Sequence, residues 1–300
     1  MTMAVQPKKA GGSVVPLFRR GASFEGEEEL QVGLPPSPVS SSGPVAKAGV
    51  DLGGLPPVWF LVGAGWSGKT LLARWLGWRA AEEGRAAVLA ALDPQNRTLP
   101  AFFEGVAQPP NADPVQTARW LRELVSWLMT EKAAGILDMG GGDTSLAALI
   151  DNTPTVAGEM EEAGVAPVAA YLLGPRVDDL ASLETFEARG FKPRATAIIL
   201  NEGRVDAGME REDAFARVLR HSAVKRALDR GAVQVWLPRL DPPELAQEIE
   251  AKRLAFGLAR DGLVPAGKTF PPIGGLNRAA VRRWLERMEA EFSPVRSWLP

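Results

Sequence analysis

The chain has 300 residues, of which 46% are hydrophobic and 23% are charged, the ordinary proportions of a folded protein. Its formal net charge is −2 and its pI about 5.7, which excludes a uniformly basic surface for nucleic acid but not a local basic patch. The absence of cysteine excludes disulfides and thiolate chemistry, and the single histidine, His221, excludes a multi-histidine metal site. Neither a membrane-spanning apolar run nor a signal-peptide pattern is evident, so we expect a cytoplasmic protein without a membrane span.

The first 55 residues predict a flexible arm. They are rich in glycine, proline and serine, most densely over 35–44, and the acidic cluster over 25–29 forms no amphipathic pattern. Such a composition cannot bury enough apolar surface to offset the entropy of the chain. A short partner-binding segment, with 14–18 as its apolar part, is the functional alternative.

From Val58 onward, short apolar runs alternate with helical periodicities. The runs that predict strands are 58–62, 86–92, 135–137, 168–173, 197–200 and 233–237. The stretches that predict helices are 69–81, 117–130, 178–188, 211–229 and 243–259. Short, nearly continuous apolar strands that alternate with helices are typical of a parallel sheet covered on both faces. We therefore predict a three-layer α/β domain over 56–260, with a mostly parallel sheet and helices on both faces.

The segment 261–300 predicts a loop followed by a docking helix. Over 276–292, Ala280, Trp284, Met288 and Phe292 recur four residues apart on one face. A membrane-binding helix is the alternative interpretation. Because the polar side mixes acidic and basic residues, docking onto the domain or onto a partner chain is favoured.

Residues 63–70, Gly63-Ala64-Gly65-Trp66-Ser67-Gly68-Lys69-Thr70, match the pattern G-x-x-x-x-G-K-[ST]. Glycines let successive backbone N–H groups point inward at phosphate oxygens, and the helix that follows adds its positive end. Lys69 is expected to reach the β- and γ-phosphates of ATP, and the Thr70 hydroxyl to bind Mg²⁺. The residues expected to contact the nucleotide here are Gly63, Gly65, Trp66, Ser67, Gly68, Lys69, Thr70 and Leu71.

A second stretch, 262–269, matches the same pattern. It follows a predicted helix instead of a strand, contains Pro265, and runs into Phe270-Pro271-Pro272 where a helix should begin. We therefore interpret 262–269 as a loop, and 63–70 as the phosphate loop of a P-loop NTPase domain over 56–260.

A phosphate loop also needs an acidic residue near the magnesium ion. The apolar run 134–137 ends in Asp138, and the three glycines 140–142 would allow close approach to the γ-phosphate. Asp138 is therefore predicted to be a Walker B type acid and a second magnesium ligand. An ordinary strand-end turn is the alternative, since aspartate and glycine are also common there.

The second predicted strand ends in Asp93-Pro94-Gln95-Asn96. With the phosphate loop and Asp138, this segment resembles the ParA/MinD family of partitioning and positioning ATPases and its relatives in plasmid transfer, over roughly 58–254. The resemblance implies that Asp93 lies near the γ-phosphate and its attacking water, that Asn201 contacts adenine, and that Pro238 lies where the last strand passes the base. It also implies a switch in which ATP binding drives homodimerisation and contact with DNA or an adaptor protein.

Two departures from that family favour alternatives. Ala64 replaces the lysine that reaches across the family's dimer, which leaves a non-deviant Walker A loop, and Ala91 replaces the first acid of D-x-D. An arginine such as Arg204 could act in trans instead. The alternatives are a nucleotide-binding scaffold with little hydrolysis and a small-molecule kinase on the same scaffold. Asn201-Glu202-Gly203-Arg204 lacks the guanine-reading N-K-x-D pattern, so adenine is the predicted base.

Basic and aromatic residues suggest further surfaces. The basic residues that could form a helical face for non-specific DNA contact are Arg217, Arg220, Lys225, Arg226 and Arg230. A solvated helix surface is the interpretation we favour. The tryptophans that lie at helical spacings are Trp75, Trp78, Trp120 and Trp127, and we expect core packing of them in preference to a stacking platform for single strands.

Overall fold

The computed structural model describes residues 48–93, 98–142 and 144–300. Most of the predicted arm, residues 1–47, and the Pro94-Gln95-Asn96 segment lie outside the described residues. From residue 48 the chain packs against the C-terminal segment. The indole Nε1 of Trp298 donates to the Val50 carbonyl at 2.6 Å, and Leu52 is buried in the core. The last residues of the predicted arm are therefore joined to the folded body.

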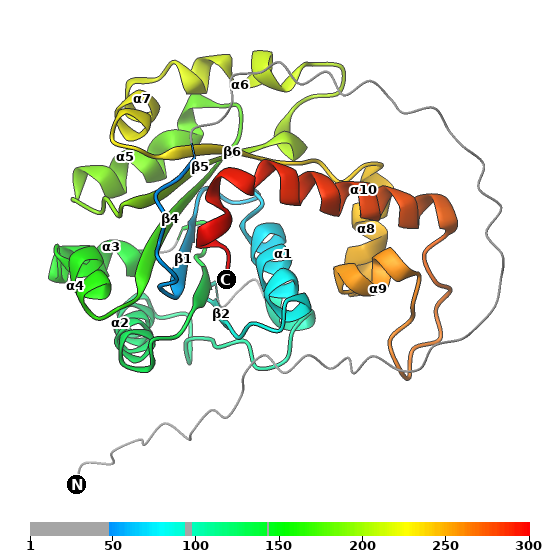
Figure 1. The fold of residues 1–300 in the computed structure, drawn as a ribbon, viewed down its shortest axis with the longest axis horizontal. Helices are drawn as coiled ribbons and strands as arrows, with labels where there is room; N and C mark the ends of the chain where they lie inside the picture. The colour runs from blue at the N-terminus through cyan, green and yellow to red at the C-terminus, as the bar shows by residue number, and fades with distance from the viewer. Residues whose placement is uncertain (1–47, 94–97, 143) are drawn as a thin grey trace, which may run out of the picture.

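Six parallel strands form one sheet in the order β2-β3-β1-β4-β5-β6 (Figure 1). The strands are β1 (Pro57–Val62), β2 (Val88–Ala91), β3 (Gly135–Asp138), β4 (Ala166–Leu173), β5 (Ala195–Asn201) and β6 (Val233–Leu237). Each predicted strand is present, although the run 86–92 pairs over only four residues. The sheet lies between two helical layers, so the predicted three-layer α/β fold is confirmed.

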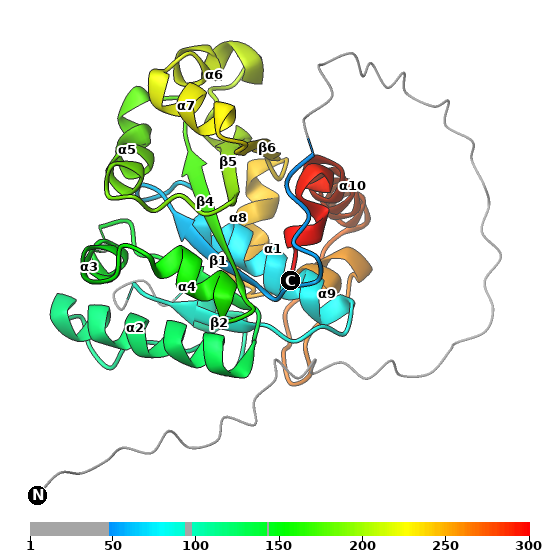
Figure 2. The ribbon, with the colours of Figure 1, turned by 60° about the vertical axis from the view of Figure 1, so that its left-hand side comes forward.

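Helices cover both faces of the sheet (Figure 2). One face carries α1 (Lys69–Glu82), α8 (Pro243–Ala251), α9 (Phe256–Asp261) and α10 (Gly275–Glu291). The other carries α2 (Pro114–Glu131), α3 (Ser145–Asn152), α4 (Val156–Glu162), α5 (Ala181–Ala188), α6 (Arg211–Leu219) and α7 (Ser222–Asp229). Alternate residues of β1 enter the two cores, Trp59 and Leu61 toward α1, Val58 and Phe60 toward α2. Continuous apolar runs were the sequence signal of this two-sided burial.

Two of the predicted long helices are broken. The stretch 211–229 forms α6 and α7, with His221 between them as the N-cap of α7, where its Nδ1 accepts from the Ala223 backbone N–H at 3.3 Å. The stretch 243–259 forms α8 and α9, separated by a turn in which Arg253 has a φ of 50°. Hydrophobic spacing alone does not reveal such breaks, because it continues across a short turn.

Some helical segments lacked a sequence prediction. They are α3, α4 and the short 3₁₀ segments Leu99–Ala101, Glu202–Arg204 and Ser293–Trp298. Another 3₁₀ turn, Val177–Leu180, leads into α5, so the predicted helix 178–188 is a 3₁₀ turn followed by an α-helix. Helices this short carry too few apolar repeats for a period to be read.

The C-terminal helix α10 lies against the domain, with Trp284 and Met288 buried. The indole Nε1 of Trp284 donates to the Pro238 carbonyl at 3.0 Å, and the guanidinium of Arg79 on α1 contacts Glu289 at 2.8 Å. The structure therefore shows α10 docked on its own chain, one of the two docking modes that the sequence left open. Among the described residues, no helix is both long and apolar enough to cross a membrane.

Candidate functional site

The strands are all parallel, so their carboxyl ends meet along one edge of the sheet. The chain leaves β1 there into the loop 63–68, which leads into α1. Asp138 ends β3, Asn201 ends β5, and Pro238 follows β6. Residues that are distant in sequence are therefore brought together around the beginning of α1.

The loop 63–68 curls tightly around the side chain of Lys69. The Lys69 Nζ donates to the carbonyls of Gly63 at 2.9 Å and Ala64 at 2.8 Å. Gly68 has a φ of 98°, and a Cβ atom there would lie 2.7 Å from the Nδ2 of Asn201. Glycine is therefore required at 68 both for its backbone conformation and for the close approach of Asn201.

Lys69 is buried in this loop. Burial lowers the pKa of its ammonium group, and the nearby carboxylates Asp138 and Asp93 oppose that shift. Lys69 and Asp93 in turn influence the pKa of Asp138. Lys69, Asp93 and Asp138 thus lie within electrostatic range of one another.

Thr70 and Asp138 are joined directly. The Thr70 Oγ1 donates to the Asp138 Oδ2 at 2.7 Å. Burial raises the pKa of Asp138 to about 6, an effect that Thr70 and Lys69 oppose and Asp93 reinforces. Because β3 is the direct neighbour of β1 in the sheet, the acid that ends one strand reaches the hydroxyl at the start of α1.

The glycines after Asp138 pack against the loop itself. A Cβ atom on Gly141 would lie 2.8 Å from the Gly65 backbone nitrogen and 3.0 Å from its Cα. A Cβ atom on Gly142 would meet nothing within 4 Å. Of these two glycines, only Gly141 is therefore required for the close approach of the two loops, whereas the sequence singled out 140–142 together for an approach to phosphate.

Two polar features of the loop fit a phosphate ligand. The Ser67 Oγ is buried and has no hydrogen-bond partner within the described part of the chain. Within the described residues, the Lys69 ammonium donates hydrogen bonds to backbone carbonyls alone, which phosphate oxygens can replace. Mg²⁺ prefers hard oxygen ligands, and Thr70 with Asp138 offers a hydroxyl and a carboxylate side by side. The residues therefore fit a nucleoside triphosphate with its magnesium ion.

Trp66 lies at the tip of the loop and is 91% exposed. Its φ of 65° is in the left-handed region, which a bulky side chain rarely adopts. Leu71, on the first turn of α1, is half-buried and packs against the core on the α1 side of the sheet. Of these two predicted nucleotide contacts, Trp66 is thus open to a ligand or a partner.

Asn201 contacts the phosphate loop. Its Nδ2 donates to the Ser67 carbonyl at 2.8 Å, while its Oδ1 accepts from the Gly203 N–H at 2.8 Å. Pro238 is buried, and its carbonyl accepts the indole N–H of Trp284. Sequence reasoning assigned Asn201 to the base alone and missed its contact with the loop, because nothing in the pattern shows which strand ends are adjacent.

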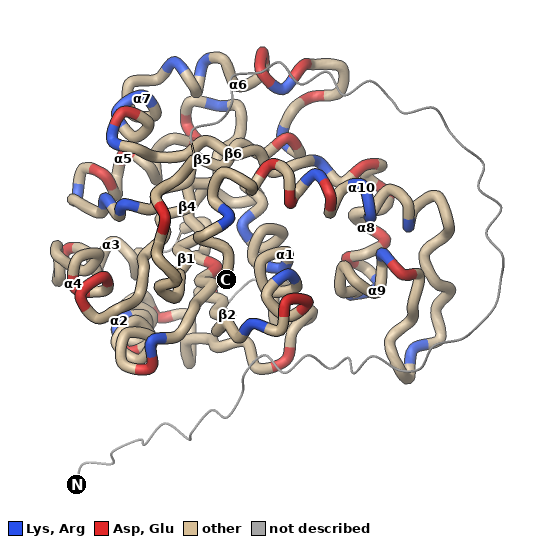
Figure 3. Tube along the Cα trace, in the orientation of Figure 1, with Lys and Arg blue, Asp and Glu red and all other residues tan. Residues whose placement is uncertain are grey.

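Other predicted residues lie apart from this site. The second motif, 262–269, is a loop between α9 and α10 in which Lys268 and Thr269 are exposed, so the sequence interpretation is confirmed. Arg204 is exposed as well. The five basic residues predicted over 217–230 are all exposed, and acidic residues also lie on α6 and α7 (Figure 3). The guanidinium of Arg230 pairs with Glu187 at 2.6 Å.

Proteins that are similar to this chain are found among solved structures. No protein-family model matches the chain, and no curated protein matches it. Among solved structures, the MinD cell division protein of Aquifex aeolicus is similar to it, with 15% identity and a TM-score of 0.40. The alignment covers 78% of this chain and 97% of that chain. The case for a function therefore rests on the geometry of the site.

Proposed function

We propose that the chain is a magnesium-dependent ATPase of the ParA/MinD type, whose nucleotide state switches its association with itself and with DNA or an adaptor protein. Its role would be in partitioning or transfer of a plasmid or chromosome, or in intracellular positioning. The observation that carries the proposal is the hydrogen bond between Thr70 and Asp138 at 2.7 Å, beside the buried ammonium of Lys69. That arrangement supplies the cation and the magnesium ligands in a single place.

In this proposal each side chain has a separate task. Lys69 would exchange its bonds with the loop carbonyls for bonds with the β- and γ-phosphates, and so neutralise their charge. Thr70 and Asp138 would hold the magnesium ion, which supplies Lewis-acid stabilisation of phosphate charge when bound. Asp93 would orient the attacking water, which agrees with its electrostatic proximity to Lys69 and Asp138. Asn201 and Pro238 would contact adenine.

A homodimer on ATP binding is part of the proposal. The exposed indole of Trp66 lies in the phosphate loop and is held in an unfavourable backbone conformation. Strain of this kind often accompanies function, because a relaxed residue would serve folding better. We assign to Trp66 a contact with a second copy of the chain across the nucleotide.

A nucleotide-binding scaffold with little hydrolysis is the second candidate. Ala64 places a methyl group where the family has a cation, and Ala91 is buried on β2 where the family has an acid. Neither side chain can stabilise charge that develops on a transferring phosphoryl group. Binding without turnover would follow if no other cation took the place of the lysine that Ala64 replaces.

ATP turnover and size-exclusion chromatography, with and without DNA, separate the two candidates. The proposal expects turnover and an ATP-dependent dimer for the wild type. In Asp93→Ala, turnover should be lost while the dimer is retained, because the substitution leaves Lys69, Thr70 and Asp138 in place. Tight ATP binding with neither turnover nor dimerisation in either protein would contradict the switch and support the scaffold.

A further inference from the structure

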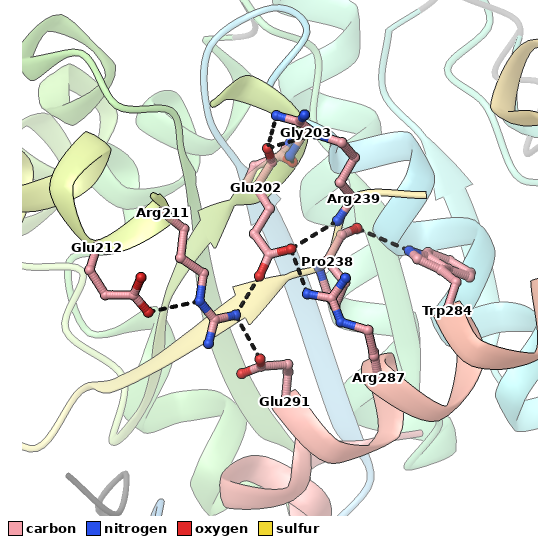
Figure 4. Close-up of polar contacts among 10 residues, drawn as sticks. Glu202, Gly203, Arg211, Glu212, Pro238, Arg239, Trp284, Arg287 and Glu291 are labelled. Atoms are coloured by element: carbon pink, nitrogen blue, oxygen red, sulfur yellow. Dashed lines mark hydrogen bonds and ion pairs between the residues drawn. The ribbon is translucent and has the colours of Figure 1, made fainter. Parts of the chain in front are cut away.

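The carboxylate of Glu202, directly after Asn201, is the centre of an ion-pair cluster (Figure 4). Its Oε1 pairs with the guanidinium of Arg211, and its Oε2 accepts from the NH2 of Arg287 at 2.7 Å. The same Oε2 accepts from the backbone N–H of Arg239 at 3.2 Å. The Glu202 side chain is only 10% exposed, so its charge depends on these partners more than a surface carboxylate would.

The backbone of Glu202 is held in the same place. The guanidinium of Arg239 donates to the Glu202 carbonyl from NH2 at 2.9 Å and from Nε at 3.2 Å. The same guanidinium donates to the carbonyl of Val205. Arg239 therefore ties the turn after β5 to the end of β6, the neighbouring strand.

The partners of Glu202 come from three other parts of the chain. Arg211 begins α6, Arg239 follows β6, and Arg287 lies on α10. An ion pair also joins α6 directly to α10, since Arg211 contacts Glu291 at 2.8 Å. The guanidinium of Arg211 stacks 4.5 Å above the ring of Trp236. The end of β5 is thus fixed from three sides, and one of them is the C-terminal helix.

Glu202 directly follows Asn201, the residue that contacts the loop 63–68. Asn201 donates to the Ser67 carbonyl, and its Nδ2 occupies the space that a Cβ of Gly68 would need. A displacement of Glu202 along the chain would therefore move Asn201 against or away from the turn that carries Lys69 and Thr70. Packed contacts of this kind transmit small shifts because neither side can deform freely.

We propose that Glu202 is a positioning residue, which through Arg287 makes the C-terminal helix α10 a support for the phosphate loop. Nucleotide binding and the docking of α10 are then coupled, and each strengthens the other. The inference rests on the proposed function for its ligand, but the support of the loop exists without a ligand.

The test compares variants of α10 and of the turn after β5 in the full chain. Arg287→Gln removes the charge that faces Glu202, Arg287→Lys keeps it, and Arg283→Gln removes an exposed arginine from the same helix as a control. Glu202→Gln removes the charge from the centre of the cluster. The readouts are the dissociation constants of Mg·ATP and of Mg·tripolyphosphate, together with amide hydrogen exchange of 63–70.

The proposal expects Glu202→Gln and Arg287→Gln to weaken binding of both ligands by about 5- to 20-fold, the range of an ordinary coupling between sites. In both variants the amides of 63–70 should exchange faster without any ligand. Arg287→Lys should largely restore the affinity, and Arg283→Gln should match the wild type. In the wild type, Mg·ATP should slow the exchange of α10.

The outcomes separate the two claims. If the wild type binds neither Mg·ATP nor Mg·tripolyphosphate, the proposed function fails, and the ligand-free exchange of 63–70 still decides whether Glu202 supports the loop. If the wild type binds but Arg287→Gln and Glu202→Gln bind equally well and exchange at the wild-type rate, the positioning role is overturned. A loss of affinity that Arg283→Gln shares would also overturn it, because the effect would then be one of general charge.

Discussion

The chain contains two copies of one phosphate-loop pattern, and the two copies lie in different structural surroundings. In 63–70 the pattern lies between β1 and α1, and Lys69 turns back into the loop to bind two carbonyls. In 262–269 the pattern follows α9, and Lys268 and Thr269 are exposed in a loop that runs on to residue 274 before α10 begins. Identical spacing of glycine and lysine thus produces two unrelated environments.

The difference shows what the pattern leaves out. Phosphate binding needs a helix N-terminus directly after the lysine and a strand end beside the threonine, and the pattern encodes neither. At 63–70, α1 begins at Lys69 and Asp138 reaches Thr70 from β3. At 262–269, α10 begins at Gly275, several residues beyond the threonine. The surrounding elements therefore turn the pattern into a site.

The difference between the two loops is tested most strongly by removing the lysine of each loop in turn. Lys69→Ala should weaken Mg·ATP binding by about 100-fold, because a charge-assisted bond to phosphate contributes about 3 kcal/mol. Lys268→Ala should leave the affinity unchanged. Equilibrium titration of the two variants checks both expectations. Equal losses in the two would contradict the assignment of the site to 63–70.

The acid associated with each pattern gives the second contrast. Burial raises the pKa of Asp138 to about 6, whereas Arg260 lowers the pKa of Asp261, which directly precedes the second pattern. Asp138→Asn should weaken magnesium-dependent ATP binding by roughly tenfold or more, the effect of losing one carboxylate ligand. Asp261→Asn should have no effect on binding. Magnesium titrations at fixed ATP distinguish the two variants.

The raised pKa of Asp138 also predicts a pH dependence of stability. The folded state holds the Asp138 proton more tightly than the unfolded state, whose carboxyl has the ordinary value of 3.8. The stabilisation that the proton provides is therefore complete below the ordinary pKa and lost as the pH rises through about 6. Above that pH, Asp138→Asn should be more stable than the wild type by at most about 3 kcal/mol.

Thermal unfolding of the ligand-free wild type and of Asp138→Asn across the acidic and neutral range checks this prediction. The difference in melting temperature should grow as the pH rises and disappear at acidic pH. A difference that does not change with pH would mean that burial does not raise the pKa of Asp138.

A smaller effect is expected at the glycines that follow Asp138. Gly141→Ala should weaken Mg·ATP binding by about tenfold, since overpacking against the Gly65 backbone costs about 1–3 kcal/mol. Gly142→Ala has open space around it and should bind like the wild type. Isothermal titration of both variants measures the difference. Equal affinities for the two would show that the contact between Gly141 and the loop does not support the site.

The smallest effect concerns the backbone of the two loops. Trp66 has a φ of 65° and Gly267 a φ of 76°, so the strained residue is in the first loop and the relaxed one in the second. Trp66→Gly should stabilise the ligand-free chain, and Gly267→Ala should destabilise it, each by about 1 kcal/mol. Urea denaturation measures both. A loss of stability in Trp66→Gly would indicate that the indole makes a stabilising contact.

Much of this fold can be predicted from the sequence because its strands are apolar throughout. The run 168–173 predicted a strand buried on both sides, and β4 is such a strand at the centre of the sheet. The break in 211–229 could not be predicted, since apolar spacing continues through the turn at His221. Short helices such as α3 and α4 could not be predicted either, because they carry too few apolar repeats for a period to be read.

The candidate site divides in the same way. Lys69, Thr70 and Asp138 were predicted because phosphate and magnesium chemistry favours those residue types at the start of a helix and at the end of a strand. Glu202 and Arg287 were not predicted, because their pairing depends on how α10 lies across the ends of β5 and β6. Local chemistry is visible in a sequence, whereas contacts between distant segments require the fold.

Hydrogen exchange of the wild-type chain, with and without Mg·ATP, tests the central claim most directly, because both patterns are measured in one protein. The account predicts that the amides of 63–70 are protected by the nucleotide and that those of 262–269 exchange at the same rate in both samples. Protection of 262–269, or an unchanged rate at 63–70 under saturating nucleotide, would contradict it.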